Sequence, residues 1–188
     1  MVRKLTILSV LEPFLAKPKD SLHLAEISKS LGQPHPTVRQ ELNFLEQKGI
    51  VKKRIKGRLT LYTLNIDNPN IIDYLVVAEK NRLISRCDTE LALKELIGFL
   101  HSLLSEQNKA LIFGSAVESL KKANDVDMLL TGKLNKQKLD EFSGKFNLKI
   151  HLISVRRLKK VSEALRQEII KKHLVIMGSE EIVRWLLL

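Results

Sequence analysis

Cysteine is nearly absent from this sequence, with Cys87 alone among 188 residues, and aromatic residues make up only 5% of the chain. A single cysteine excludes both an intramolecular disulfide framework and a cysteine-rich zinc site. Long apolar runs are lacking too, since none approaches the roughly 18 residues that a membrane span needs. We therefore expect a fold held together by packing alone, with no membrane-spanning segment.

The amino-terminal segment lacks the pattern of a secretory signal. Its apolar stretch is interrupted by Glu12, Pro13 and Lys17, and no small-residue cleavage site follows. Hydrophobic residues nonetheless make up 44% of the chain, which is enough to bury a core. We expect a folded cytoplasmic protein with one or two small domains.

Acidic residues are too few to balance the basic ones. The chain has 32 Lys and Arg against 21 Asp and Glu, which gives a net charge of +11. The first 70 residues hold 12 basic and 6 acidic residues, so this part is the more basic per residue. A positive surface attracts polyanions and gains affinity when their counterions are released. Nucleic acid is the partner that this charge suggests, and an ordinary solvated lysine-rich surface is the alternative.

The first 65 residues predict three helices, a short strand and a hairpin. Apolar residues repeat at helical spacing in three segments, of which the second ends at Gly32 and the third at Gly49. A strand is expected at 21–24, before the second helix. Residues 51–64 form two apolar or β-branched runs around a basic tip that contains glycine, which is a hairpin signal.

This order of elements, with the sequence of residues 36–51, resembles the winged helix-turn-helix domains of prokaryotic transcription regulators. The third helix of such a domain can place its polar amino-terminal residues in the major groove of DNA, with Arg39 as the direct base reader. The basic wing would lie beside phosphates or reach a minor groove. A role as a protein-interaction module is the alternative. The residues predicted to contact double-stranded DNA are Thr37, Arg39, Gln40 and Asn43 on the helix, and Lys52, Lys53, Arg54, Lys56 and Arg58 on the wing.

A turn cluster at residues 67–70 marks the expected end of the first domain. We predict a winged-helix domain over 1–68, a helical connector over 69–105 and a second domain over 106–188. The connector could supply a homodimer interface, or its apolar residues could pack within the chain. The fold class is therefore α+β. In the second domain we expect strands near 110–113, 125–130, 148–153 and 173–177, and helices over 134–146, 156–172 and 179–188.

The second domain carries Gly114-Ser115 at the end of one strand and Asp125-Val126-Asp127 at the start of the next. This pattern resembles the core motif of the minimal nucleotidyltransferases in the polymerase-β superfamily, which implies a small mixed sheet. Glycine lets backbone approach a nucleoside triphosphate, and Ser115 would open a helix whose free N–H groups attract phosphate. Alternate carboxylates on a strand share a face, where they can hold Mg²⁺. The resemblance thus assigns phosphate binding to Gly114 and Ser115, and metal binding to Asp125 and Asp127. A capped turn and a solvated strand end are the alternative.

The match to this family is incomplete. Active members usually carry a third carboxylate on a following strand, but residues 148–155 contain no acid. Alternation places His151 at that position, where it could act as a catalytic base or be an ordinary strand residue. Glu118, close after the Gly-Ser pair, would repel phosphate. We therefore expect transferase turnover to be weak or absent.

Two functions stay open on the sequence alone. One is a DNA-binding transcription regulator with a degenerate nucleotidyltransferase-like domain that senses a nucleotide or binds a partner. The other is an active Mg²⁺-dependent nucleotidyltransferase that modifies RNA, protein or a small molecule, in one version as part of a toxin–antitoxin pair.

Overall fold

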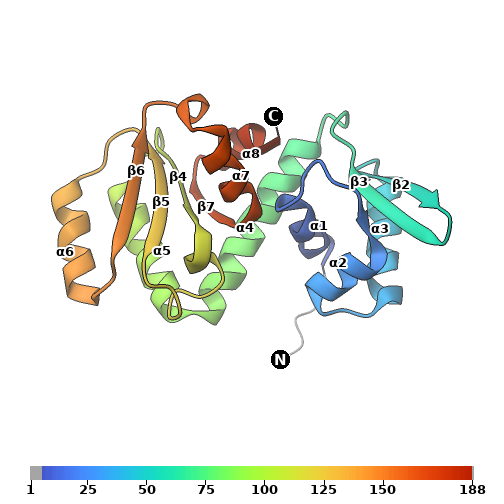
Figure 1. Cartoon of the computed structure of the whole chain (residues 1–188), viewed down its shortest axis with the longest axis horizontal. Coiled ribbons are helices and arrows are strands. Elements are labelled where there is room, and N and C mark those ends of the chain that lie inside the picture. The colour runs from blue at the N-terminus through green and yellow to red at the C-terminus, as the bar shows by residue number, and fades with distance from the viewer. Residues whose placement is uncertain (1–5, 188) are drawn as a thin grey trace. The chain divides into compact units, whose positions relative to one another are not determined.

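The computed structural model describes residues 6–187, which form an α+β fold of two units (Figure 1). The first unit ends at Asn81, and the second runs from Arg82 to Leu186. The boundary falls inside helix α4 (Ile71–Thr89). The predicted division into 1–68, 69–105 and 106–188 stays a prediction, and its residues 1–5 and 188 lie outside the described part of the chain.

The described part of the first unit contains three helices, a three-stranded antiparallel sheet and the first part of α4. The elements are α1 (Ile7–Leu15), β1 (Leu22–His23), α2 (Leu24–Leu31), α3 (His35–Gln47), β2 (Val51–Lys56) and β3 (Leu59–Leu64). The sheet has the order β1-β3-β2, so the short β1 pairs with β3, the second strand of the hairpin. This order and pairing confirm the predicted winged helix-turn-helix fold.

Local sequence signals set the helix ends in this unit. Thr6 and Ser9 form a capping box at the start of α1, in which each side chain accepts a hydrogen bond from the other residue's backbone N–H. Gly32 ends α2 with a φ of 61°, a left-handed conformation that costs glycine little. Pro36 lies in the first turn of α3, where its missing N–H is not needed.

The core of the first unit lies between its three helices. Val38, Leu42 and Leu45 form the buried stripe of α3, and each has an exposed fraction of 0%. Val10 and Phe14 on α1 are buried to the same degree. Because one stripe of α3 is committed to this core, its opposite face is left to solvent.

A four-stranded mixed sheet organises the second unit. The remaining elements are α5 (Leu91–Leu103), β4 (Lys109–Phe113), the 3₁₀ helix η1 (Gly114–Val117), β5 (Val126–Thr131), α6 (Lys136–Phe146), β6 (Ile150–Val155), the 3₁₀ helix η2 (Leu158–Lys160), α7 (Glu163–Lys171), β7 (His173–Met177) and α8 (Ser179–Leu187). The strand order of the sheet is β6-β5-β4-β7, with β5 and β6 parallel and the other neighbours antiparallel.

Both faces of this sheet are covered by helices. Alternate residues of β4 divide between two cores, since Ile112 packs with residues of α5 and α6 whereas Leu111 packs with residues of α7 and α8. Leu96 of α5 and Ile182 of α8 are buried on the two sides. The sheet therefore has a hydrophobic core on each of its faces.

Two predicted helices differ from those in the structure. The helix expected over 156–172 begins only at Glu163, because the Ser162 hydroxyl accepts a hydrogen bond from the Leu165 N–H and caps it there. The helix expected after Ser115 is the four-residue η1. Just beyond η1, the carbonyl of Glu118 accepts a hydrogen bond from Arg86 at 2.7 Å, in place of a helical N–H.

Candidate functional site

The exposed face of α3 carries the residues predicted to enter the major groove. Thr37, Arg39 and Gln40 are exposed, on the side of the helix away from the buried stripe. Asn43 is half-buried, and its side-chain oxygen lies 3.5 Å from the ammonium of Lys53 on the wing. Three of the four predicted side chains are therefore free to meet a ligand in the first unit, and the fourth touches the wing.

The wing presents an almost unbroken run of exposed residues. Every residue from 52 to 59 is exposed, including the turn at Gly57, whose φ of 59° suits glycine. Among the described residues, Arg54, Lys56 and Arg58 have no hydrogen-bond or ion-pair partner for their side chains. The outer wing therefore displays uncompensated positive charge.

Two wing lysines differ from the others because they are paired. Lys52 lies 2.8 Å from the carboxylate of Asp67, and Lys53 lies 3.7 Å from that of Glu46 on α3. The Lys53 side chain is only 30% exposed. The sequence placed Lys53 among the DNA contacts, but the structure shows that its ammonium already joins the wing to α3.

A buried tyrosine lies beneath the wing. Tyr62 on β3 is opposite Lys53 in the strand register and is 1% exposed. Burial raises the pKa of its hydroxyl, and the nearby Glu46 carboxylate raises it further. The phenol is therefore uncharged at pH 7, so it does not offset the positive charge of the wing.

In the second unit, the structure brings Gly114, Asp127 and His151 together at one end of the sheet. Phe113 and Asp127 are register partners on β4 and β5, and Asp127 is the register partner of His151 on β6. A Cβ atom at Gly114, where φ is 77°, would lie 3.1 Å from the Asp127 carboxylate. His151 Nδ1 lies 3.1 Å from the other oxygen of that carboxylate. Only a residue without a side chain fits at 114 without crowding Asp127.

The other two residues predicted for this site lie at its margin. Asp125 comes just before β5 and is half-buried, and Ser115 is exposed in η1. A helix as short as η1 offers no sustained dipole for phosphate. Within residues 6–187, no three His, Cys, Asp or Glu side chains group as metal ligands. Mg²⁺ is commonly held by one or two carboxylates together with substrate phosphates, so Asp125 and Asp127 could take part only with a nucleotide present.

Glu118 does not present the free negative charge that the sequence suggested. Its carboxylate lies 2.7 Å from the ammonium of Lys172, and this hydrogen bond lowers the pKa of Glu118. The carbonyl of Lys172 also accepts a hydrogen bond from the Gly114 N–H at 3.2 Å. Lys172 thus offsets the acid and holds the Gly-Ser turn. Sequence reasoning missed this residue because 54 positions separate it from Glu118.

No protein-family model and no curated protein matches the chain. Among solved structures, it is similar to MepR, a transcription regulator of the Staphylococcus aureus multidrug efflux pump MepA, at 22% identity and a TM-score of 0.36 over 54% of this chain, and it spans 65% of the MepR chain. It is also similar to TrmBL2, an archaeal chromatin protein, at 16% identity and a TM-score of 0.28, covering 86% of this chain and 68% of that one. At such low TM-scores the winged-helix assignment rests on the element order and strand pairing of the chain itself.

None of the helices within residues 6–187 is both long enough and apolar enough to cross a bilayer.

Proposed function

We propose that the chain is a DNA-binding transcription regulator whose first unit reads double-stranded DNA with α3 and the wing. The observation that carries this proposal is the outer wing, where Arg54, Lys56 and Arg58 are exposed and unpaired among the described residues. Cations free of carboxylates can neutralise phosphates and release counterions without first breaking an ion pair. The exposed polar face of α3, in the same compact unit, supplies the groups that read bases.

The proposed roles differ along this surface. Arg39 has the donor geometry for bidentate contact with guanine, whereas Thr37 and Gln40 offer hydrogen bonds to neighbouring base edges or phosphates. The wing cations contact backbone and add affinity without sequence preference. Lys53 and Asn43 link the wing to α3, so we assign them to orienting the two surfaces as well as to contacting DNA.

Fluorescence anisotropy with the full chain and a labelled duplex tests this function. Arg54→Gln/Lys56→Gln should weaken binding to every duplex about 10–100-fold, because two phosphate contacts are lost. Lys121→Gln/Lys122→Gln is the matched control, since it makes the same charge change at exposed positions of the second unit and should alter affinity less than about twofold. Equal losses of DNA affinity in the two variants would show that only net charge matters and would contradict the role given to the wing.

Sequence reading is tested separately with Arg39→Ala. Loss of a bidentate base contact should remove about 1–3 kcal/mol of discrimination at one or two base pairs, whereas affinity for unrelated duplexes changes little. A selection from randomised duplexes, run on wild type and variant, measures this directly. An unchanged base preference at every position would remove Arg39 from the reading surface.

A second candidate function is nucleotide binding at the Gly114 end of the second sheet. It is favoured by the close approach of Gly114, Asp127 and His151, which places a carboxylate and an imidazole beside the Gly-Ser turn. We propose a nucleotide-sensing site there, with Asp125 and Asp127 as ligands for Mg²⁺ carried by the triphosphate. The chain's own groups would position phosphate, and His151 would hold or move a proton at Nδ1. A working transferase and a homodimer both stay predictions.

Calorimetric titration with ATP, with and without Mg²⁺, tests the second candidate. Binding that requires Mg²⁺ and is abolished by Asp127→Asn supports it, and binding unaffected by that variant contradicts it. Incorporation of α-labelled nucleotide into RNA or protein separates a sensor from an enzyme. Labelling lost in both Asp127→Asn and His151→Ala would establish turnover with histidine as the base.

A further inference from the structure

A cavity of about 570 Å³ opens at the end of the second sheet away from Gly114. It is lined by Lys109, where β4 begins, and by Thr131, where β5 ends, whereas Gly114 and Asp127 lie at the other ends of these antiparallel strands. Its volume falls in the range of about 300–1,000 Å³ that is typical of small-molecule sites. The cavity is therefore large enough for a ligand and separate from the predicted nucleotide site.

Positive charge dominates the lining of this cavity. Five basic side chains face one acid, and that acid, Glu181, is already paired with Lys109 at 3.0 Å, which lowers the pKa of Glu181. Arg184 pairs with Glu180 at 2.8 Å. The other three basic residues of the lining are Arg156, Arg157 and Lys159.

Those three cations are unpaired in the part of the chain that the structure describes. No carboxylate or other side chain within residues 6–187 forms an ion pair or hydrogen bond with them, and all three are exposed. Arg156 and Arg157 lie between β6 and η2, Lys159 lies within η2, and all three line the cavity. A guanidinium pair in this position can bind a carboxylate or phosphate through parallel hydrogen bonds.

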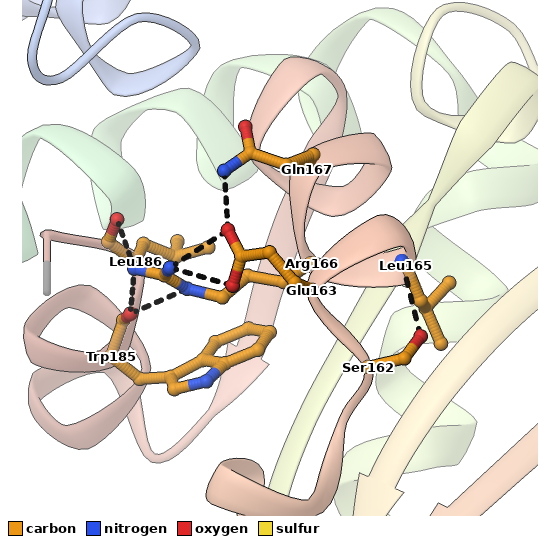
Figure 2. A network of polar contacts seen from close by, with 7 residues as sticks. All are labelled: Ser162, Glu163, Leu165, Arg166, Gln167, Trp185 and Leu186. Atoms are coloured by element: carbon orange, nitrogen blue, oxygen red, sulfur yellow. Dashed lines mark hydrogen bonds and ion pairs between the residues drawn. The ribbon is translucent and has the colours of Figure 1, made fainter.

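Another part of the cavity lining is apolar and includes an indole ring. Trp185 on α8 lines the cavity and is 8% exposed, and Leu158 of η2 adds an aliphatic contact. Figure 2 shows how Arg166 holds this tryptophan: its guanidinium donates hydrogen bonds to the Trp185 carbonyl at 3.0 and 3.2 Å and lies 5.8 Å from the ring centroid. Glu163 in turn accepts hydrogen bonds from Arg166 and Gln167. The indole is thus fixed before any ligand arrives, which lowers the entropy cost of binding.

We propose that this cavity binds a small amphipathic anion, with a flat apolar body against Trp185 and a carboxylate or phosphate against Arg156, Arg157 and Lys159. An inorganic anion would leave the indole wall unused, and an uncharged aromatic molecule would leave the cations without a partner. Only a ligand with both parts satisfies both walls. This site is independent of the proposed DNA contacts.

The chain contains a single tryptophan, so one indole N–H signal in a ¹H–¹⁵N spectrum reports on the cavity. The full-length labelled protein is titrated with 1-naphthoate as an aromatic carboxylate, AMP as an aromatic phosphate, and 1-naphthalenemethanol as an uncharged analogue. We expect a saturable shift of this signal with at least one anion, and the anion that binds more tightly identifies the source of the charge. The uncharged analogue should bind at least about tenfold more weakly, because charge-assisted hydrogen bonds are absent.

Arg156→Gln/Arg157→Gln should lower the affinity for the tighter-binding anion about tenfold or more. Lys121→Gln/Lys122→Gln makes the same change in charge and should alter this affinity less than about twofold. Asp127→Asn should leave the affinity for the anion unchanged, which would show that the anion does not bind at the proposed nucleotide site. Raising salt must also weaken binding to the wild-type protein, a readout that needs no variant. Absence of a saturable shift with either anion, equal binding of the uncharged analogue, or wild-type affinity in the arginine variant would overturn the proposal.

Discussion

The two units carry similar excess charge but display it in different ways. Residues 1–81 contribute a net charge of +5 and residues 82–188 contribute +6. In the first unit the unpaired cations stand on a hairpin that is exposed from residue 52 to 59, whereas in the second they line a cavity beside a fixed indole. An extended cationic hairpin suits a polyanion, and a cationic cluster at a cavity with an apolar wall suits a small anion. Net charge therefore predicts that an anion binds, and only the local geometry indicates which kind.

Leu42→Ala tests whether DNA binding needs the folded first unit, because it destabilises this unit without altering any charge. Leu42 is fully buried in the core of α3, so truncation should cost about 2–5 kcal/mol of unfolding free energy. DNA affinity should fall as the unit loses its structure. Urea denaturation monitored by circular dichroism measures the loss, with the exposed Thr37→Ala as a control expected to change stability by less than about 0.5 kcal/mol. DNA binding that persists in an unfolded Leu42→Ala protein would show that charge alone is sufficient.

Arg166→Leu tests the cavity of the second unit, because it removes the guanidinium that holds the Trp185 indole in place. The Arg166 side chain is only 13% exposed and satisfies carbonyls of Trp185 and Leu186 at the end of α8. Leaving these carbonyls without donors should cost about 1–3 kcal/mol. Thermal unfolding measures that loss, and broadening of the Trp185 indole signal reports the freed ring. Gln167→Leu, which removes only a contact to Glu163, is the milder control; equal effects from the two variants would contradict the role given to Arg166.

Lys172→Gln should have the smallest effect, and it sharpens the difference between paired and unpaired cations. The Glu118–Lys172 pair is largely exposed, so its loss should cost no more than about 1 kcal/mol. Because Lys172 lowers the folded pKa of Glu118, the contribution is complete above the ordinary carboxyl pKa and disappears as the pH falls through the lowered value. Unfolding of wild type and variant should therefore converge in acid. A stability difference that grows at low pH would have the wrong sign.

Local signals in the sequence predicted much of the fold. Gly32 and Pro36 mark helix ends that depend on only a few neighbouring residues, and the hairpin around Gly57 depends on its own two strands. One failure was local, because the Ser162 cap that starts α7 at Glu163 was overlooked. Another involves distant residues. The helix expected after Ser115 is only the short η1, and the Glu118 carbonyl beyond it accepts a hydrogen bond from Arg86, 32 positions earlier. No local pattern carries that information.

In the candidate sites, too, features set by nearby residues could be predicted and features set by distant residues could not. Exposure of Arg39 and the wing could be predicted, because the buried stripe of α3 and the hairpin fix which side faces water. The pairing of Lys53 with Glu46 could not, since it depends on how the wing packs against α3. The cavity was missed altogether, because Arg156 and Arg157 were assigned to a helix and Trp185 lies 28 positions beyond Arg157.

The salt dependence of DNA binding tests the central claim most directly. The logarithm of the association constant, measured by anisotropy from low to moderate salt, should fall linearly with the logarithm of the salt concentration. If Arg54 and Lys56 each neutralise one phosphate, Arg54→Gln/Lys56→Gln should reduce the magnitude of this slope by about 1.8, and Arg156→Gln/Arg157→Gln should leave it unchanged. Identical slopes for the wild type and the wing variant would contradict the assignment of the wing to the DNA backbone.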